Sequence, residues 1–482
     1  MDFSKRLLCC LVLNAIFLRG IAGADSPSPF PRGYVMEGED IGGTKPEINL
    51  NEMAGLPDWA SVAVQHRTRY ETLDHSFRAG SVNGDQIISQ RTLAQAELRF
   101  SKNFMFKAEM MDARGQLVDK GTLVDTASID AADLLEGNFQ WHAENLFVNG
   151  SKSILRAGRL TLDVGDRRLI ARNRFRNNIN AFTGLDGIWQ SANGNQVRGF
   201  YTLPVDRLPN DRPSVAANDG VMDRERPERR FWGVVLSSPN MPWGYGELFY
   251  FNLQEEDAPG FLTQNRRYNI PGLRVALPKK RGEFDWEVMS SFIVGKSRAS
   301  TAATDTKDLD HFAYFHHAEI GYSFNAPWSP RLTMEYNYAS GDPDPNDNKN
   351  GAFELLFGRG VVDFGPTSIY SAFQQQNVNS PGARFQIRPH DNLKAYVNYQ
   401  AYWLAEKTGV WASSSGLRDL TGASGAFLGH QLIARTSWQA LSNLLLEGGI
   451  AYRVDSDYQK TVPGSPREGN TTYAYLSTTI SF

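Results

Sequence analysis

Hydrophobic and polar residues alternate at every second position in many short segments of the chain after residue 56. Successive side chains of a β-strand point to opposite faces, so this alternation predicts strands with one apolar and one polar face. About 18 such segments can be marked. One of them places these apolar residues on one face: Leu393, Ala395, Val397, Tyr399, Ala401 and Trp403. Its other face carries Lys394, Asn398 and Gln400.

The connections between these segments alternate between short and long. Short links follow the even-numbered segments, for example 101–103, 149–152, 193–195, 278–282 and 325–328. Long polar links follow the odd-numbered ones, at roughly 114–138, 160–182, 204–229, 254–265, 296–309, 341–380, 405–426 and 454–470. Outer-membrane barrels have this asymmetry, with tight periplasmic turns and long extracellular loops, whereas a soluble sandwich has no reason to sort its loops in this way.

The two patterns together predict an all-β fold, a transmembrane antiparallel up-and-down β-barrel of about 18 strands. A barrel of 16 strands is the alternative, because residues 160–182 and 343–380 could hide or lose a strand. The apolar faces would then meet lipid, and the charged faces would line the inside. A soluble β-sandwich produces the same alternation, so only the loop lengths and the end of the chain separate the two folds.

Composition favours such a barrel over a helical membrane protein. No segment after the N-terminus reaches 18 consecutive apolar residues. A hydrophobic content of 41% suits strands that show one face to lipid, and an aromatic content of 12% suits girdles at the membrane interfaces. The formal net charge is −3, so there is no basic excess that would indicate a nucleic-acid partner.

The N-terminus is typical of an export signal. Lys5 and Arg6 precede an apolar run of about a dozen residues, which is too short to span a bilayer. A small-residue cleavage site ends at Ala24, so residues 1–24 are expected to be a signal peptide. Both cysteines of the chain lie in this segment, which leaves no disulfide or thiol chemistry in the mature protein. The expected location is the outer membrane of a Gram-negative envelope.

Residues 25–56 contain several prolines and glycines without periodicity, and we interpret them as an irregular periplasmic segment, with a short plug or a partner-binding segment as the alternative. Residues 57–482 would form the barrel. The last predicted strand begins at Tyr473 and ends on Phe482. A terminal aromatic residue on an amphipathic strand resembles the signal that the bacterial barrel-assembly machinery recognises, so this machinery is an expected partner.

Two regions carry a family resemblance. The first comprises residues 158–170 (GRLTLDVGDRRLI) and 182–187 (FTGLDG), and the second 336–342 (YNYASGD) and 353–357 (FELLF). They resemble the alginate-export family of outer-membrane proteins, and the resemblance implies a monomeric 18-stranded barrel. It also implies an arginine-rich lumen that attracts a polyuronate. The chain departs from the family pattern at Glu354 and Gly358, where Asp and Pro are more usual.

Basic residues on predicted inward faces and in the loop after residue 160 are the candidate pore-lining or substrate-binding residues. They are Arg67, Arg69, Arg91, Arg99, Lys107, Arg159, Arg167, Arg168, Arg384, Arg388, Arg435 and Arg453. Inward glutamates accompany them: Glu71, Glu97, Glu109, Glu287, Glu319, Glu335 and Glu447. One interpretation is an anion-selective constriction, narrowest near strands 1, 2 and 14. The other is a network of arginine–carboxylate pairs that stiffens the wall, and the two can hold at different depths.

The loop that contains Asp163, Asp166, Arg167 and Arg168 has the same two interpretations. It could fold into the lumen and bind an anionic substrate through bidentate guanidinium groups, or it could be anchored to the wall by its own ion pairs.

Evidence for a metal site or an active site is weak. The run from Asp342 to Asn348 places oxygen ligands Asp342, Asp344 and Asn346 at alternate positions, as calcium loops do, but lacks the glycine and closing glutamate of an EF-hand. His316 and His317 would point to opposite faces of a strand and cannot chelate one metal. No nucleophile elbow, phosphate loop or HExxH motif is present, so neither an enzyme nor a cofactor is predicted.

The predicted function is passive transport of a hydrophilic solute across the outer membrane. Export or uptake of an anionic oligo- or polysaccharide is the favoured form of this hypothesis, with outer-membrane lipid and the solute as partners. The alternatives are a general diffusion porin, a barrel enzyme that acts on lipid or glycan, and a secreted soluble all-β protein that binds or cleaves carbohydrate.

Overall fold

The computed structural model describes residues 50–81, 83–119, 121–361, 363–466 and 469–482. The predicted signal peptide and most of the predicted irregular segment lie outside these residues. The part of that segment that is described includes a short helix, α2 (Leu50–Met53), whose Asn51 side chain accepts a hydrogen bond from the amide of Val62. Among the described residues, no helix is long and apolar enough to cross a bilayer.

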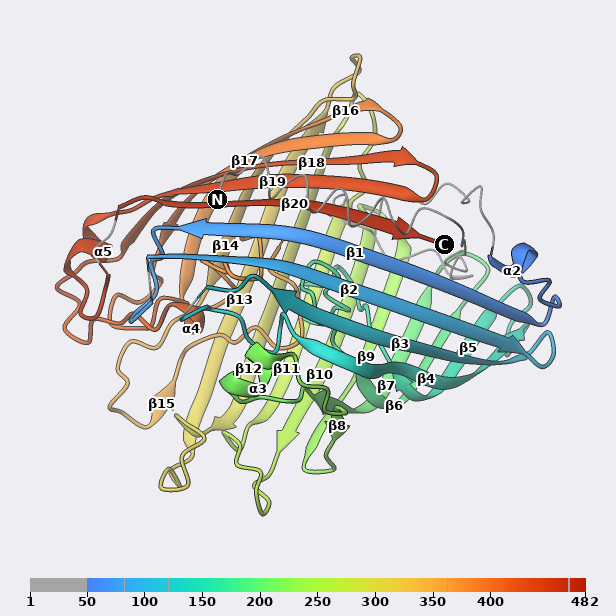
Figure 1. Cartoon of the computed structure of the whole chain (residues 1–482), viewed down its shortest axis with the longest axis horizontal. Helices are drawn as coiled ribbons and strands as arrows, with labels where there is room; N and C mark the ends of the chain where they lie inside the picture. Colours follow the sequence, from blue (N-terminus) through green and yellow to red (C-terminus); the bar gives the residue numbers. More distant parts are fainter. Residues whose placement is uncertain (1–49, 82, 120, 362, 467–468) are drawn as a thin grey trace.

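Eighteen of the twenty strands form one closed antiparallel barrel, as the sequence predicted (Figure 1). In chain order they are β1 (Ala60–Asp74), β2 (Gly84–Arg99), β3 (Phe104–Gln116), β4 (Asp130–Glu144), β5 (Lys152–Leu160), β6 (Phe182–Gln190), β7 (Gln196–Asp206), β9 (Arg229–Met241), β10 (Gly244–Glu255), β11 (Arg267–Leu277), β12 (Phe284–Ser297), β13 (Leu309–Ser323), β14 (Arg331–Ala339), β16 (Val378–His390), β17 (Leu393–Trp403), β18 (Phe427–Leu441), β19 (Leu444–Val454) and β20 (Thr471–Ser481).

The remaining elements are short and lie in the loops. They are the two-residue strands β8 (Arg224–Glu225) and β15 (Lys349–Asn350) and the helices α3 (Arg212–Ala217), α4 (Ala412–Ser415) and α5 (Asp457–Thr461).

The barrel closes by pairing of its first and last strands. β1 and β20 pair antiparallel from Gln65 opposite Ser481 to Asp74 opposite Thr472. Phe482 extends this seam, because its amide donates to the carbonyl of Val64 at 2.7 Å and its carbonyl accepts from the Val64 amide at 2.9 Å. Closure leaves no open strand edge, so the backbone groups of all the barrel strands can be paired.

The two ends of the barrel differ as the loop lengths predicted. Tight turns such as 391–392 and 442–443 gather at the end that carries α2 and the last strand's C-terminus, and we call this the short-turn end (Figure 1). Helices α4 and α5 lie at the opposite, long-loop end (Figure 1). One predicted boundary is wrong, because β4 already begins at Asp130. Register shifts in the β3–β4 pairing interrupt the period of two there and hide the start of the strand.

Alternation along the strands separates a lipid-facing surface from an inner one. On β17, Val397 and Tyr399 are each 45% exposed, whereas Asn398 is 1% and Gln400 0% exposed. Ala401 was predicted on the apolar face, but this small side chain is buried. Other exposed apolar side chains continue the outer surface around the barrel: Leu155, Leu185, Val234, Leu248, Leu273, Val288, Ile320, Met334, Phe385, Leu432, Ile450 and Leu476.

Two of the long loops enter the barrel instead of staying outside it. We call residues 161–181 inner loop A and residues 340–361 and 363–377 inner loop B. The loops pair with each other, since Phe357 donates its amide to the carbonyl of Leu169 at 3.1 Å and accepts from the Ala171 amide at 2.9 Å. Phe373 of inner loop B stacks on the buried Tyr402 of the wall, and Trp411 from the next long loop packs against Phe373. The lumen therefore contains a packed core.

The alternation on β17 predicts a pattern of lipid contact. We expect a bimane fluorophore on Val397→Cys or Tyr399→Cys to be quenched strongly by brominated lipid, because both side chains lie on the outer face, and a fluorophore on Asn398→Cys to be quenched much less. The measurement is fluorescence of each labelled protein after reconstitution. Equal quenching at all three positions would contradict this face assignment.

The seam predicts a role for the backbone of the last residue. Deletion of Phe482 removes two hydrogen bonds to Val64, each worth about 0.5–1.5 kcal/mol, and should lower the folded fraction seen as heat-modifiable migration on gels. Phe482→Ala keeps both backbone bonds and tests the aromatic ring separately. If deletion leaves the folded fraction unchanged, the seam does not need this residue.

Candidate functional site

Three predicted arginines of the first two strands hold inner loop A. Arg67 on β1 donates to the carbonyls of Arg174 and Arg176 at 2.8 and 2.9 Å, and Arg91 on β2 donates to the same two carbonyls at 3.1 and 3.0 Å. Arg69 donates to the Phe175 carbonyl at 2.6 Å. These guanidinium groups therefore bind loop backbone, and the structure does not place them on an open pore surface.

Arg168 joins both inner loops to the wall. Its guanidinium donates to Asp166 at 2.5 Å, to Glu287 of β12 at 2.6 Å and to Asp363 of inner loop B at 2.9 Å. His317 of β13 lies 2.9 Å from the same guanidinium. All of these side chains are buried. One cation thus ties the loops and two strands together, which is the anchoring role that the sequence left open for this loop.

Most of the other predicted residues also pair with carboxylates or carbonyls. Lys107 lies 3.1 Å from Glu136, and Arg384 lies 3.0 Å from Glu335. Arg99 is half exposed and lies 3.2 Å from Glu97. Three further residues face the long loops: Arg159 pairs with Glu225 at 2.7 Å, Arg453 donates to Gln459 and Thr471, and Arg167 lies 3.9 Å from Asp163. These contacts agree with the second interpretation of the sequence, a network of ion pairs and hydrogen bonds that stiffens the wall.

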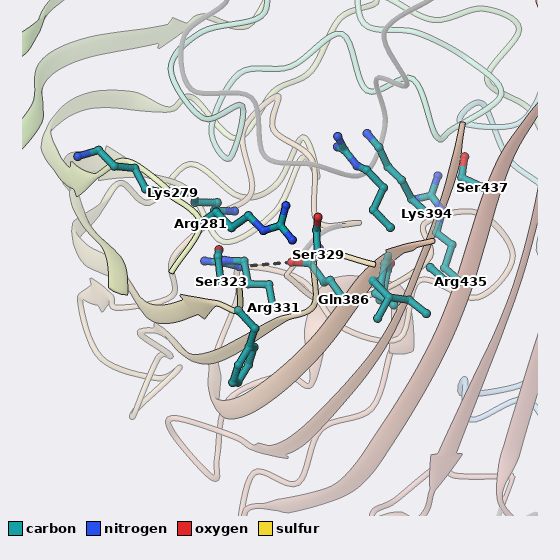
Figure 2. Close-up of a pocket in the computed structure, with 15 residues that line it drawn as sticks. Lys279, Arg281, Ser323, Ser329, Arg331, Gln386, Lys394, Arg435 and Ser437 are labelled. Atoms are coloured by element: carbon teal, nitrogen blue, oxygen red, sulfur yellow. Dashed lines mark hydrogen bonds between the residues drawn. The ribbon is translucent and has the colours of Figure 1, made fainter. Parts of the chain in front are cut away.

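Arg388 and Arg435, the other two predicted residues, line a cavity of about 200 Å³ at the short-turn end. Fifteen of the described residues line it, from the β11–β12 and β13–β14 turns and from strands β13, β14 and β16 to β18. Figure 2 shows Lys279 and Arg281 on one side of this space, Lys394 and Arg435 on the other, and Arg331 and Gln386 between them. We call it the cationic cavity.

Strand register builds the floor of the cationic cavity. Ser323 of β13 is opposite Arg331 of β14, and Arg331 is opposite Gln386 of β16. Gln386 is opposite Tyr396 of β17, and Tyr396 is opposite Arg435 of β18. Residues opposite one another in a sheet share a face, so these five side chains form one inward row across five neighbouring strands. Arg331 donates to Gln386 at 3.3 Å along this row (Figure 2).

The charge of the lining is strongly one-sided. Seven of the fifteen described lining residues are basic, and none is acidic: the basic ones are Lys279, Lys280, Arg281, Arg331, Arg388, Lys394 and Arg435. Carboxylates outside the lining pair with four of them: Arg331 lies 2.5 Å from Asp285, Arg435 lies 2.6 Å from Glu447, Lys280 lies 3.6 Å from Glu283 and Lys279 lies 4.0 Å from Glu319. The arrangement can bind anionic groups, because several cations converge on one space with a low-dielectric wall behind them.

Sequence reasoning found only part of this site. Lys279, Lys280 and Arg281 lie in a segment that was predicted as a short turn, and their run of three basic residues was the available signal. Lys394 was placed on the polar face of its strand but was not named as a candidate. Their convergence on Arg388 and Arg435 depends on strand register and on the turn conformations, which a single sequence does not contain.

The calcium hypothesis for Asp342, Asp344 and Asn346 gains no support from the geometry. Asp342 accepts from the Gly351 amide at 3.3 Å, and Asp344 accepts from the Asn346 amide at 3.0 Å, so both stabilise the turns of their own loop. The histidine prediction is confirmed, because His317 is buried inside and His316 contacts Phe292 and Tyr314 on the outer face.

Comparison with protein families gives one match that covers most of the chain. A model described as alginate export matches residues 58–452. No curated protein matches the chain at a significant level.

Solved structures with a similar fold are outer-membrane proteins of Pseudomonas aeruginosa. OccK9 (OpdG) has a TM-score of 0.56 at 12% identity, over 88% of this chain and 98% of that one. OccD3 (OpdP) has a TM-score of 0.54 at 11% identity, over 88% and 91%. OccK2 (OpdF), solved in complex with glucuronate, has a TM-score of 0.53 at 12% identity, over 88% and 96%. At these identities the likeness shows the fold.

The network around Arg168 predicts a large effect of its loss. Arg168→Ala leaves Asp166 and Asp363 buried without their main cation, so we expect a loss of about 3–5 kcal/mol in the free energy of unfolding and a higher single-channel conductance as the inner loops loosen. Urea unfolding and planar-bilayer recording measure the two effects.

Arg114→Ala is the matched control for this prediction. Arg114 pairs with Asp112, but both side chains are about two-fifths exposed, so its loss should cost at most about 1 kcal/mol. An Arg168→Ala protein with the stability and conductance of the control would show that the network does not hold the loops.

Proposed function

The chain belongs to the alginate export family, it forms an outer-membrane channel for a hydrophilic solute, and we propose that this solute is an anionic oligo- or polysaccharide. The single observation that carries the proposal is the cationic cavity, whose described lining holds seven basic and no acidic side chains. By the usual orientation of outer-membrane barrels, the short-turn end faces the periplasm, so the cavity would form the periplasmic entrance or exit of the lumen.

Electrostatics explains why such a cavity suits a polyanion. Fixed positive charges in a narrow vestibule lower the free energy of entry for carboxylates and raise their local concentration. Lysines such as Lys279 and Lys394 act as point charges on flexible stems, whereas Arg281 and Arg388 offer planar guanidinium groups that can bind a carboxylate with two hydrogen bonds. Several cations spread over four strands and the β11–β12 turn can contact successive carboxylates of one chain, although each contact is weak.

A structural neighbour supports the class of solute. OccK2 was solved in complex with glucuronate, which is a sugar carboxylate. Its 12% identity to this chain does not transfer a binding site, but it shows that a barrel of this fold can hold such a ligand.

We assign the inner loops the role of the constriction. They fill the lumen between the cationic cavity and the long-loop end, and buried ion pairs with Arg168 hold them in place. Passage of a saccharide chain then depends on the position of these loops. The direction of transport, export or uptake, does not follow from this arrangement.

General diffusion is the second candidate, and the mixed charges in the middle of the lumen favour it. Arginine–carboxylate pairs such as Arg384 with Glu335 cancel one another there and give no net preference for anions. In either case we propose passive transport, as the membership of the alginate export family supports.

The proposal predicts anion selectivity that depends on the cationic cavity. Under a salt gradient across a planar bilayer, the wild-type reversal potential should show anion preference, and the double variant Arg281→Gln, Lys394→Gln should lose most of it. Block of the current by a polyuronate oligomer should weaken about tenfold in the variant, from the loss of two weak ionic contacts.

Two controls separate the cavity from a general charge effect. Lys102→Gln with Lys152→Gln removes the same charge from exposed positions at the same end of the barrel, outside the cavity, and should leave the block unchanged. A neutral oligosaccharide of equal length should not block the wild type. Cation preference in the wild type would exclude an anionic solute, and equal block by both oligomers would favour general diffusion.

A further inference from the structure

An aromatic ring lies on the floor of the cationic cavity, among its basic side chains. Tyr396 of β17 is half-buried, lines the cavity, and stands in the inward row between Gln386 and Arg435. The alternate positions Val397 and Tyr399 of the same strand face lipid. Attraction of anions by the surrounding cations does not use this ring, so its place on the floor has a separate consequence.

A buried arginine holds the ring from its deeper side. The guanidinium carbon of Arg384 lies over the ring, 5.6 Å from its centroid, and a cation in this position is attracted by the ring face. Arg384 precedes Gln386 by two positions on β16, which runs toward the short-turn end, so it lies deeper in the lumen than the cavity floor. It is 4% exposed and lies outside the described cavity lining. The ring of Tyr396 is therefore packed between Arg384 and the cavity, and its other face is open to a solute.

Hydrogen-bonding and charged groups border this ring on both sides. Gln386 offers an amide across one strand spacing of about 4.8 Å, and Arg435 offers a guanidinium across the next. Lys394 lies two positions before Tyr396 on the same inward face, and Figure 2 shows Lys394 and Arg435 on one side of the cavity. The floor thus combines an apolar ring face with an amide and two cations.

Other aromatic rings near the cavity are not placed in this way. Phe324 also lines the cavity, but it packs edge-on against Tyr322 of the outer face, with 4.9 Å between the ring centroids. Tyr475 and Phe175, on the far side of Arg435, are in edge contact with each other and are 6% and 5% exposed. Tyr396 is therefore the ring of this group that can meet a solute inside the cavity.

A sugar acid has the two kinds of surface that this floor would contact. Its carboxylate and hydroxyl groups are polar, whereas a face of its pyranose ring presents mainly C–H groups. The face of an aromatic ring carries partial negative charge and attracts the slightly positive hydrogens of C–H groups, and flat contact also removes apolar surface of both rings from water. A polyanion without rings, such as a chain of acidic amino acids, has no such face.

We propose that Tyr396 is a stacking site for a sugar ring and that it makes the cationic cavity selective for acidic saccharides over other polyanions. The inference rests on the proposed function and adds the residue by which the channel would distinguish a saccharide from any other carrier of carboxylates. One sugar ring lies on Tyr396, while its carboxylate contacts Arg435 or Lys394 and a hydroxyl group contacts Gln386.

Block of the channel current by two oligomers of equal charge tests the proposal. Wild-type protein in a planar bilayer should be blocked by hexagalacturonate at a lower concentration than by hexaglutamate with capped ends. Tyr396→Leu should weaken the block by hexagalacturonate about fivefold and leave the block by hexaglutamate unchanged, because only the sugar loses a stacking partner. Tyr396→Phe keeps the ring and should keep the preference for the saccharide.

Tyr399→Leu is the matched control, because it removes the same type of residue from the lipid-facing side of the same strand. This control should change neither block. Heat-modifiable migration on gels checks the folding of each variant. If the leucine variant does not fold, Tyr396→Met, with an unbranched and more adaptable side chain, repeats the test.

The outcomes separate the stacking site from the proposed function. Equal weakening of both blocks by Tyr396→Leu would show that the ring only shapes the cavity, and an unchanged block by hexagalacturonate would show that the sugar does not contact it. Either result overturns the stacking site and leaves the anionic solute in place. A wild type that neither oligomer blocks would overturn the proposed function and the stacking site with it.

Discussion

Burial of guanidinium groups inside a closed sheet is the constraint on which the arrangement of this lumen depends. A charged group taken out of water costs several kcal/mol unless ionic and hydrogen-bonding partners surround it. Arg69, Arg168 and Arg453 are almost wholly buried, and each has partners from at least two segments of the chain. The inner loops supply many of these partners, so the charges of the wall and the positions of the loops determine each other.

The barrel itself could be predicted because its environment imposes a simple rule. Lipid on one side and polar contents on the other require alternation, and alternation is visible in a single sequence. The rule fails where geometry departs from it, as at the bulged pairing that hides the start of β4 at Asp130. It also says nothing about where a loop goes. Arg168 and Asp363 are 195 residues apart, so their contact could not be inferred from local pattern.

The sequence predicted a site made of inward-facing basic residues, but it identified only some of the residues that form it. Arg388 and Arg435 were named because alternation put them inside, and it put Arg67 and Arg91 inside for the same reason. The loops decide which of these arginines bind loop backbone, since inner loop A occupies Arg67 and Arg91 with its own carbonyls. The turn residues Lys279 and Arg281 join the site through their position beside β13 and β14, which depends on three-dimensional register.

Basic residues therefore have two different roles, which depend on their depth along the lumen. In the middle, arginines and carboxylates are matched and hold loops, so that their fields largely cancel. At the short-turn end, seven basic residues line one space, and the carboxylates paired with them just outside the described lining are fewer, so that a net positive field remains. A Debye length of about 8 Å at physiological salt confines that field to the vestibule. Selection of an anion then takes place at the mouth, while the inner loops limit what can pass beyond it.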